Sequence, residues 1–217
     1  MIIDPYTWHR LEILRIQPVA KDTVAVYLPR PADYHFRAGQ YAVVRVTSEA
    51  NTWVRQYSFA SAPEASELCF LIQREPGGAV SNWFFSSASN GMAIEISESF
   101  GNFVPDLSQQ SVFIAGKVGV APFISVLSAH SSAGKLYYCV REEEELCTSL
   151  LPEATNLHAC VTTTGTRLGD SELKTIVAME RPVYVCGSKL FVDGLSQRLQ
   201  KLGQPTELLH KELFTLE

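Results

Sequence analysis

The feature that most constrains the fold is a change in the sequence pattern between residues 105 and 110. Before this point, short apolar runs of strand length are separated by Pro and Gly at close intervals. After it, apolar runs alternate with longer segments of helical pattern. A chain of 217 residues is long enough for two domains of about 100 residues each. We therefore predict two domains, over residues 1–107 and 108–217.

The first half has the pattern of an antiparallel β-barrel. Its strand-like segments are RLEILRIQPV, DTVAVYLP, GQYAVVRV, RQYSFAS, LCFLIQR and MAIEIS. Strands that are short and separated by regular turn signals are typical of a small barrel or sandwich. One segment, AVSNWFFSSA at residues 79–88, is expected to be a short helix between strands.

The second half has the pattern of a doubly wound α/β domain. Its apolar runs are SVFIAG, KLYYCV, LHACVTTT, PVYVCG and TELLHKEL. The segments between them, expected to be helices, are APFISVLSAHSS, EEEELCTSLL, DSELKTIVA and KLFVDGLSQRLQKLG. Strands joined by helices predict a parallel sheet, because parallel neighbours need crossover connections. Ligands of such sheets bind at the carboxyl ends of the strands.

Composition excludes several classes of function. A net charge of −5 without a dense Lys/Arg stripe argues against nucleic acid as a partner. No apolar run approaches the roughly 20 residues of a membrane span. The start, MIIDPYTWHR, has Asp4 and Pro5 where a signal peptide needs a basic end and an apolar core, so we expect a cytoplasmic protein. Five scattered cysteines, with no CxxC pair, predict reduced thiols and no metal site.

The segment RQYSFASAP, residues 55–63, places two kinds of ligand-binding side chain on one strand. Strand alternation predicts that Arg55 and Tyr57 share a face and that Ser58 lies on the other. A guanidinium beside an aromatic ring suits a ligand with a phosphate and a flat ring. The alternative is a half-buried strand that ends at Pro63.

Three glycine-containing turns are candidate binding sites. In IAGKVGVAPF, Gly116 and Gly119 precede Pro122 at an expected helix start, where backbone amides can bind phosphate. The turn lacks the GxGxxG fingerprint, and a turn without a ligand is the alternative. In REPGGAVSNWF, Gly77 and Gly78 precede another helix start. In PVYVCGSKLF, a strand ends at Cys186 and Gly187, where Cys186 is a candidate reactive thiol or a packed core thiol.

The order of these and other motifs resembles the ferredoxin-NADP reductase superfamily over nearly the whole chain. The motifs are FRAGQY, RQYS, GGAVSNWF, FGNF, AGKVGVAPF, VCGS and the terminal KELF. The resemblance implies that Arg55 binds a flavin phosphate, Tyr57 packs on the isoalloxazine ring and Ser58 hydrogen-bonds near the reactive nitrogen. It further implies that Gly78, Val80 and Ser81 contact the flavin phosphates. The residues implied along the nicotinamide dinucleotide are Gly116, Gly119, Pro122, Cys186 and Gly187.

The predicted function is a flavoprotein reductase that transfers a hydride from NADH or NADPH to bound FAD, with FMN as the alternative flavin. Ser58 and Cys186 are the candidate catalytic residues, and electrons pass to a separate acceptor protein or small molecule. The alternatives are a free-flavin or ferric reductase and an electron-transfer subunit with weak nicotinamide reactivity. Lys117 favours the latter, because it stands where the family often has a second glycine.

Two further segments bear on the nicotinamide. Phe214 in KELF is expected either to cover the flavin face that the nicotinamide must reach or to pack the end of the last strand. Thr164 and Arg167 follow the third parallel strand, where they either bind a 2′-phosphate or are solvated. The choice between NADH and NADPH stays open.

Overall fold

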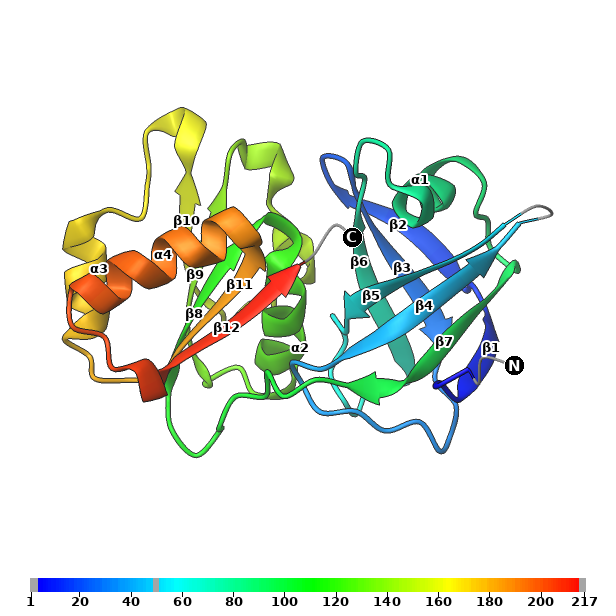
Figure 1. Ribbon diagram of the computed structural model, residues 1–217, viewed down its shortest axis with the longest axis horizontal. Helices are drawn as coiled ribbons and strands as arrows, with labels where there is room; N and C mark the ends of the chain where they lie inside the picture. The colour runs from blue at the N-terminus through cyan, green and yellow to red at the C-terminus, as the bar shows by residue number, and fades with distance from the viewer. Residues whose placement is uncertain (1–3, 49–50, 215–217) are drawn as a thin grey trace.

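The computed structural model describes residues 4–48 and 51–214. Two halves lie side by side, with antiparallel sheets in the first half of the chain and a parallel sheet in the second (Figure 1). The predicted fold class, an antiparallel β-barrel followed by a doubly wound α/β unit, is confirmed.

The barrel half is made of two antiparallel sheets, in the orders β1-β7-β4-β5 and β2-β3-β6. Its elements are β1 (Trp8–Glu12), β2 (Arg15–Ala20), β3 (Thr23–Pro29), β4 (Tyr41–Thr47), β5 (Thr52–Ser58), β6 (Glu67–Gln73), α1 (Ala79–Ser86) and β7 (Ala93–Phe100). A bridge between Phe59 and Phe70 connects the end of β5 to β6. The expected single strand over residues 10–19 is wrong, because Ile13 leaves the ladder and exchanges hydrogen bonds with Met92 and Gly91.

The second half has five strands in the order β10-β9-β8-β11-β12, all parallel. The strands are β8 (Ser111–Gly116), β9 (Gly134–Val140), β10 (Asn156–Val161), β11 (Val183–Ser188) and β12 (Leu209–Phe214), and the α-helices are α2 (Ala121–Ala129), α3 (Asp170–Val177) and α4 (Lys189–Lys201). Because β11 pairs directly with β8, the turns after both strands open at the same edge of the sheet.

The segment of residues 142–151 is not the helix that its acidic run predicts. It forms two short 3₁₀ turns, η2 (Glu143–Glu145) and η3 (Thr148–Leu150). The carboxylate of Glu145 folds back to accept hydrogen bonds from the amides of Arg141 and Glu142. Leu146 then adopts an extended conformation, with φ −77° and ψ 119°. The acidic side chain therefore caps the start of a short turn, and the turn ends at Leu146.

A continuous apolar cluster joins the two halves. It includes Cys69 and Leu71 of β6, and Phe123 and Leu127 of α2. Across this contact, the hydroxyl of Ser125 in α2 donates to the carbonyl of Ser61, at 2.6 Å. The predicted domain boundary at residues 107/108 lies in the connection between β7 and β8 and stays a prediction.

Two features are absent from residues 4–48 and 51–214. No helix there has the length and apolar character needed to cross a membrane. No group of three or more His, Cys, Asp or Glu side chains there is arranged to hold a metal ion.

Candidate functional site

The RQYS strand lies at the edge of its sheet. β5 pairs with β4 and has no second neighbour in the described four-stranded sheet. Arg55 and Tyr57 are both half-buried, whereas Gln56 between them is exposed, so the predicted alternation is observed. The Arg55 guanidinium forms no ion pair with a described residue and donates to the carbonyl of Val54 at 2.8 Å. Burial raises the pKa of Tyr57 well above its usual value, which keeps the phenol neutral.

Ser58 ends β5 with a buried side chain that is only 5% exposed. Its hydroxyl makes no hydrogen bond to another residue within the described ranges, although a buried hydroxyl normally has a partner. Opposite it on β4 lies Tyr41. Ser58 is therefore a buried residue whose hydroxyl has no hydrogen-bond partner among the described residues and is free for a ligand.

The GGAVS segment forms a tight turn into α1, which packs against β5 and β6. Gly77 has a φ of +77°, and Gly78 is the N-cap residue. A Cβ on Gly78 would lie 2.6 Å from the Ser81 hydroxyl oxygen. That hydroxyl accepts from the Glu75 amide and donates to the Gly78 carbonyl, so it holds the turn itself.

The first turn of α1 is free to bind an anion through its backbone. The helix has no side-chain cap and no acidic residue in its first turn. Val80 and Ser81 are buried, so they offer a ligand their amides and not their side chains. Uncapped amides at the positive end of a helix favour a phosphate group.

The turn after β8 is held close to β11. It forms the 3₁₀ turn η1 (Lys117–Val120), and Pro122 follows in the first turn of α2. A Cβ on Gly119 would lie 2.4 Å from the Cys186 carbonyl oxygen and 2.8 Å from the Gly187 Cα. Glycine at 119 therefore permits a backbone approach that brings the two predicted dinucleotide segments together.

Cys186 contributes to this approach through its backbone. Its side chain is fully buried in the cluster between the halves, and burial raises the pKa of its thiol well above the usual value. A neutral, inaccessible thiol is a poor nucleophile. The assignment of Cys186 as a catalytic residue stays a prediction, and it requires an exposure of the thiol that this structure does not have.

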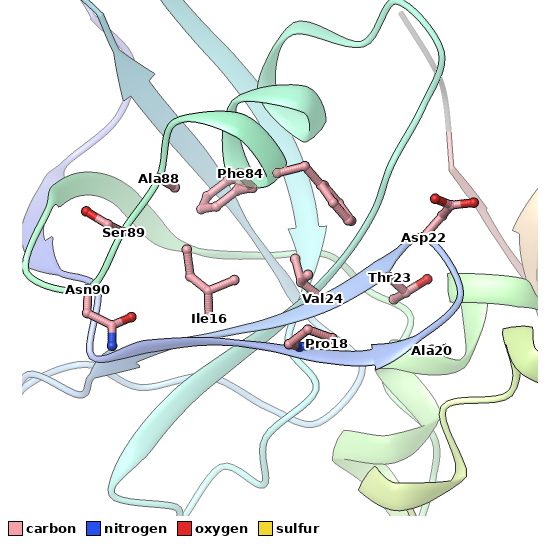
Figure 2. A pocket seen from close by; sticks show the side chains of 11 residues that line it. Ile16, Pro18, Ala20, Asp22, Thr23, Val24, Phe84, Ala88, Ser89 and Asn90 are labelled. Atoms are coloured by element: carbon pink, nitrogen blue, oxygen red, sulfur yellow. The ribbon is translucent and has the colours of Figure 1, made fainter.

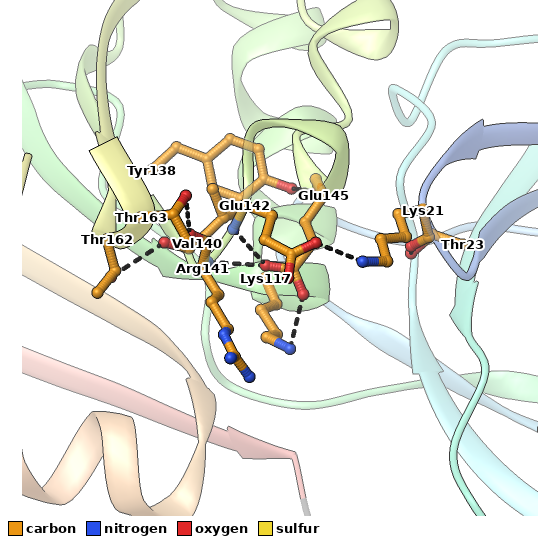
Figure 3. A network of polar contacts seen from close by, with 10 residues as sticks. All are labelled: Lys21, Thr23, Lys117, Tyr138, Val140, Arg141, Glu142, Glu145, Thr162 and Thr163. Atoms are coloured by element: carbon orange, nitrogen blue, oxygen red, sulfur yellow. Dashed lines mark hydrogen bonds and ion pairs between the residues drawn. The ribbon is translucent and has the colours of Figure 1, made fainter. Parts of the chain in front are cut away.

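Lys117 does adopt the backbone conformation of a glycine, with a φ of +50°. Its ammonium pairs with the Glu145 carboxylate at 2.8 Å (Figure 3). A second ion pair joins Glu142 to Lys21, in the turn between β2 and β3, and the Lys21 amide donates to the Glu144 carbonyl at 2.6 Å. The segment after β9 thus connects the glycine-containing turn to the barrel half.

The pairing of Glu145 predicts a pH-dependent loss of stability. Burial raises the pKa of Glu145, but Lys117 and the two amide donors outweigh it, so the pKa lies below its ordinary value. A carboxyl group with a lowered pKa stabilises the folded state at pH values above its unfolded pKa of about 4.3. This stabilisation is lost as the pH falls through the pKa of the folded state. We expect Glu145→Gln to be less stable than the original protein by about 1 kcal/mol at pH 7, with the difference disappearing below about pH 4. Urea unfolding at several pH values measures this, and a constant difference would contradict it.

Glu212 is a further candidate for the site, and sequence reasoning missed it. It lies on β12 opposite Cys186 and is half-buried, and burial raises the pKa of its carboxyl group. Its charge also contributes to a raised pKa of Tyr41, after the larger effect of burial, so Glu212 reaches toward the barrel half. The arrow of β12 points toward that half (Figure 1). The KELF motif contained the residue, but no pattern in the sequence indicated its burial.

Phe214 is the last described residue of β12, and it pairs with Ser188. It is half-buried and packs against the cluster between the halves.

Thr164 uses its hydroxyl to donate to the Val161 carbonyl at 3.0 Å, and Arg167 is exposed. Neither position decides between the two nicotinamides.

Two hollows in the surface lie away from the predicted residues. One, of about 710 Å³, lies between β2 and α1 and is lined by Ile16, Pro18 and Phe84, among others (Figure 2). Another, of about 620 Å³, is lined by Tyr184 and His210 near the start of β12. Two of the predicted residues, Ser58 and Pro122, each lie three residues before a member of the Ser61–Ser125 hydrogen bond between the halves.

Comparison with known proteins agrees with this geometry. The family described as oxidoreductase FAD-binding domain matches residues 11–104. The flavohemoprotein of Bacillus subtilis is 28% identical over 90% of this chain and 56% of its own length. The ferredoxin reductase component of 3-ketosteroid-9-alpha-monooxygenase from Mycobacterium tuberculosis is 28% identical over 85% of this chain and 56% of its own length. The chain thus spans about half the length of these curated relatives.

The fold likeness extends over both halves. A ferredoxin NADP⁺ reductase from Neisseria gonorrhoeae, crystallised with bound FAD and NADP, superposes with a TM-score of 0.81 at 20% identity. The superposition covers 96% of this chain and 99% of the other. Residues 11–104 therefore match an oxidoreductase FAD-binding domain, and the chain shares the two-part fold of a ferredoxin NADP⁺ reductase.

Proposed function

We propose that this protein is a reductase that takes a hydride from NADH or NADPH onto FAD and passes electrons to a separate acceptor. The acceptor is a ferredoxin-like or oxygenase-component protein, as the name of the mycobacterial relative suggests, or a small molecule. Bound FAD supplies the redox chemistry, while the protein supplies binding, orientation and exclusion of water. The observation that carries the proposal is the Ser125–Ser61 hydrogen bond, which holds the end of the flavin strand against the dinucleotide helix.

The free groups of the barrel half fit a flavin. Arg55 has no carboxylate partner among the described residues, and the first turn of α1 offers uncapped amides, so both are available to phosphate oxygens. Tyr57 offers its ring on the same face as Arg55. Ser58, at the end of β5, offers a hydroxyl that has no partner among the described residues.

The dinucleotide is proposed to bind along the turns at Gly116–Gly119 and Cys186–Gly187, with its phosphates near the start of α2. Pro122 fits such a site because it removes no amide that the first turn needs for its own hydrogen bonds. The fixed junction then orients the nicotinamide toward Ser58, which lowers the barrier by positioning. A cytoplasmic location belongs to the same proposal, supported by five cysteines that are all free.

The test is the visible absorption spectrum of the purified protein, followed by anaerobic titration with NADH and with NADPH. A retained flavin spectrum that bleaches with one equivalent of nicotinamide supports the proposal, and analysis of the released flavin separates FAD from FMN. Colour lost on desalting, with activity restored by added flavin, would instead indicate a free-flavin reductase. Retained colour without bleaching would indicate an electron-transfer subunit with weak nicotinamide reactivity.

Ser58→Ala is expected to slow flavin reduction at least tenfold while flavin affinity changes little. The hydroxyl is proposed to act at the reacting end of the ring, where general positioning effects are worth about tenfold or more. Single-turnover reduction by the preferred nicotinamide measures the rate, and flavin titration measures affinity. Ser86→Ala, at an exposed hydroxyl near the end of α1, is the matched control and is expected to leave both unchanged. A wild-type reduction rate in the Ser58 variant would remove Ser58 from the reacting end.

Phe214→Ala is expected to change the KM for the nicotinamide several-fold while flavin stays bound. The ring is proposed to cover the position that the nicotinamide takes during reduction, so its loss removes a competitor. Leu213→Ala, at the neighbouring 38% exposed residue, is the control. Steady-state kinetics and a melting curve distinguish this role from packing. Unchanged kinetics with a lowered melting temperature would assign Phe214 to packing alone.

A further inference from the structure

Two cysteines that the proposed reaction does not use lie side by side at the carboxyl edge of the parallel sheet. Cys139 of β9 and Cys160 of β10 are direct partners in the strand register. We propose that they form a reversible redox site, in which hydrogen peroxide oxidises the two thiols to a disulfide.

The side chains of the pair share one face of the sheet. Cys160 belongs to the cluster formed with α3 and α4, and Cys139 packs against the same cluster. On its other side, toward the sheet centre, Cys139 pairs with Gly116 of β8, the first residue of the glycine-containing turn. Neighbouring strands lie about 4.7–4.9 Å apart, inside the 4.4–6.8 Å range of Cα separations found in disulfides. Closure of the bond therefore needs only a local adjustment.

The pair differs from the other three thiols. Cys69, Cys147 and Cys186 are buried, and none has a cysteine as its strand partner within the described residues. Cys147 lies in the cluster on the opposite face of the sheet. Cys139, by contrast, is partly exposed.

The two thiols are also chemically coupled. The neighbouring thiol lowers the pKa of Cys160 and raises the pKa of Cys139, because ionisation of one thiol is stabilised by the proton of the other. The charge of the singly ionised pair therefore lies mainly on Cys160, and transfer of the proton between the two sulfurs gives the minor form with the charge on Cys139. Cys139 is partly exposed and Cys160 is buried, so we assign Cys139 as the attacking sulfur and Cys160 as the resolving sulfur.

The reaction balances as a two-electron oxidation. The Cys139 thiolate attacks one peroxide oxygen, the O–O bond breaks, and the products are a sulfenic acid and, after protonation, water. The Cys160 sulfur then attacks the sulfenic sulfur, which forms the S–S bond and releases a second water. Overall, two thiols and one hydrogen peroxide give one disulfide and two waters.

The strand geometry favours reversibility. Side chains of in-register parallel strands run parallel, so their Cβ atoms lie about one strand spacing apart, beyond the 3.5–4.5 Å of a relaxed disulfide. A bond that must draw the strands together is strained, and strained disulfides are reduced more easily than structural ones. We therefore expect dithiothreitol to restore both thiols.

The experiment titrates the complete protein with hydrogen peroxide and counts thiols after denaturation. The number of free thiols should fall from five to three, and dithiothreitol should restore it to five. Mass spectrometry after non-reducing tryptic digestion should find residues 136–141 linked to residues 142–167. Because Cys147 lies in the same tryptic peptide as Cys160, Cys147→Ala is the matched control, and the link should persist in it.

Variants assign the roles within the pair. Cys139→Ser and Cys160→Ser should each abolish the linked peptide, and dimedone should label Cys139 in the Cys160 variant after peroxide treatment. If either serine variant fails to fold, the peptide map of the original protein in its native fold still decides the question. A link that involves Cys147, intermolecular dimers, or oxidation to sulfonic acid without a link would overturn the proposal.

Discussion

Gly119→Ala is expected to abolish NAD(P)H-dependent reduction and to destabilise the α/β half by roughly 3 kcal/mol or more. The added methyl group would lie 2.4 Å from the Cys186 carbonyl oxygen and 2.7 Å from its carbonyl carbon. Both contacts are to backbone, so no rotamer change relieves them, and overpacking of this kind costs about 1–3 kcal/mol even where some relaxation is possible. The turn after β8 must then move away from β11.

The functional loss follows from the same displacement. The two turns are proposed to bind one dinucleotide between them, and their separation would misplace it. The barrel half makes no contact with the new methyl group among the nearest atoms, so flavin binding should persist. A retained flavin spectrum with no bleaching by NADH or NADPH, and a melting temperature lowered by roughly 6–12 °C, is the expected result.

Gly194→Ala is the matched control for this experiment. Gly194 lies in α4, and a Cβ there meets no atom within 4 Å. Alanine in a helix interior is favoured over glycine by about 1 kcal/mol, so the control should be slightly stabilised and fully active. If Gly119→Ala bound nicotinamide and melted as the original protein does, the close approach of the two turns would have no role in the proposed site.

The sequence was sufficient wherever a local rule determines the structure. Alternation placed Arg55 and Tyr57 on one face of β5, because a strand has no other periodicity. Pro122 marked the start of α2, since its ring suits only the first turn. The crossover rule made the second sheet parallel, and the pairing of β11 with β8 then brought Gly187 beside Gly116.

The sequence could not predict features that depend on contacts between residues far apart in the chain. Glu145 caps the start of a turn by accepting hydrogen bonds from nearby amides, but its ion pair with Lys117 joins segments that only the tertiary fold brings together. Glu212 gives no sign of burial in KELF, because burial depends on what β12 faces. Cys139 and Cys160 are separated by a 3₁₀ segment, and only the register of β9 with β10 makes them partners.

Arg55→Ala is expected to weaken flavin binding by about 1.5–3 kcal/mol, which corresponds to a roughly 10- to 150-fold higher Kd. That is the range for hydrogen bonds to a charged group, and the guanidinium has no described partner except the neighbouring Val54 carbonyl. Its free donors therefore point to a phosphate, and its loss should not disturb the packing of β5. Fluorescence titration of the apoprotein with FAD measures the change, with a melting curve as the test of folding.

Two further variants separate charge from geometry in this binding. Arg55→Lys keeps the charge but loses the forked donors, so its affinity should fall between those of the original protein and the alanine variant. Gln56→Ala removes an exposed side chain from the opposite face of β5 and should bind FAD as the original protein does. Equal loss in the Gln56 and Arg55 variants would mean that any disturbance of the edge strand weakens flavin binding. An unchanged Kd in a folded Arg55→Ala variant would instead place the flavin phosphate elsewhere, with the α1 amides as the remaining anion site of the barrel half.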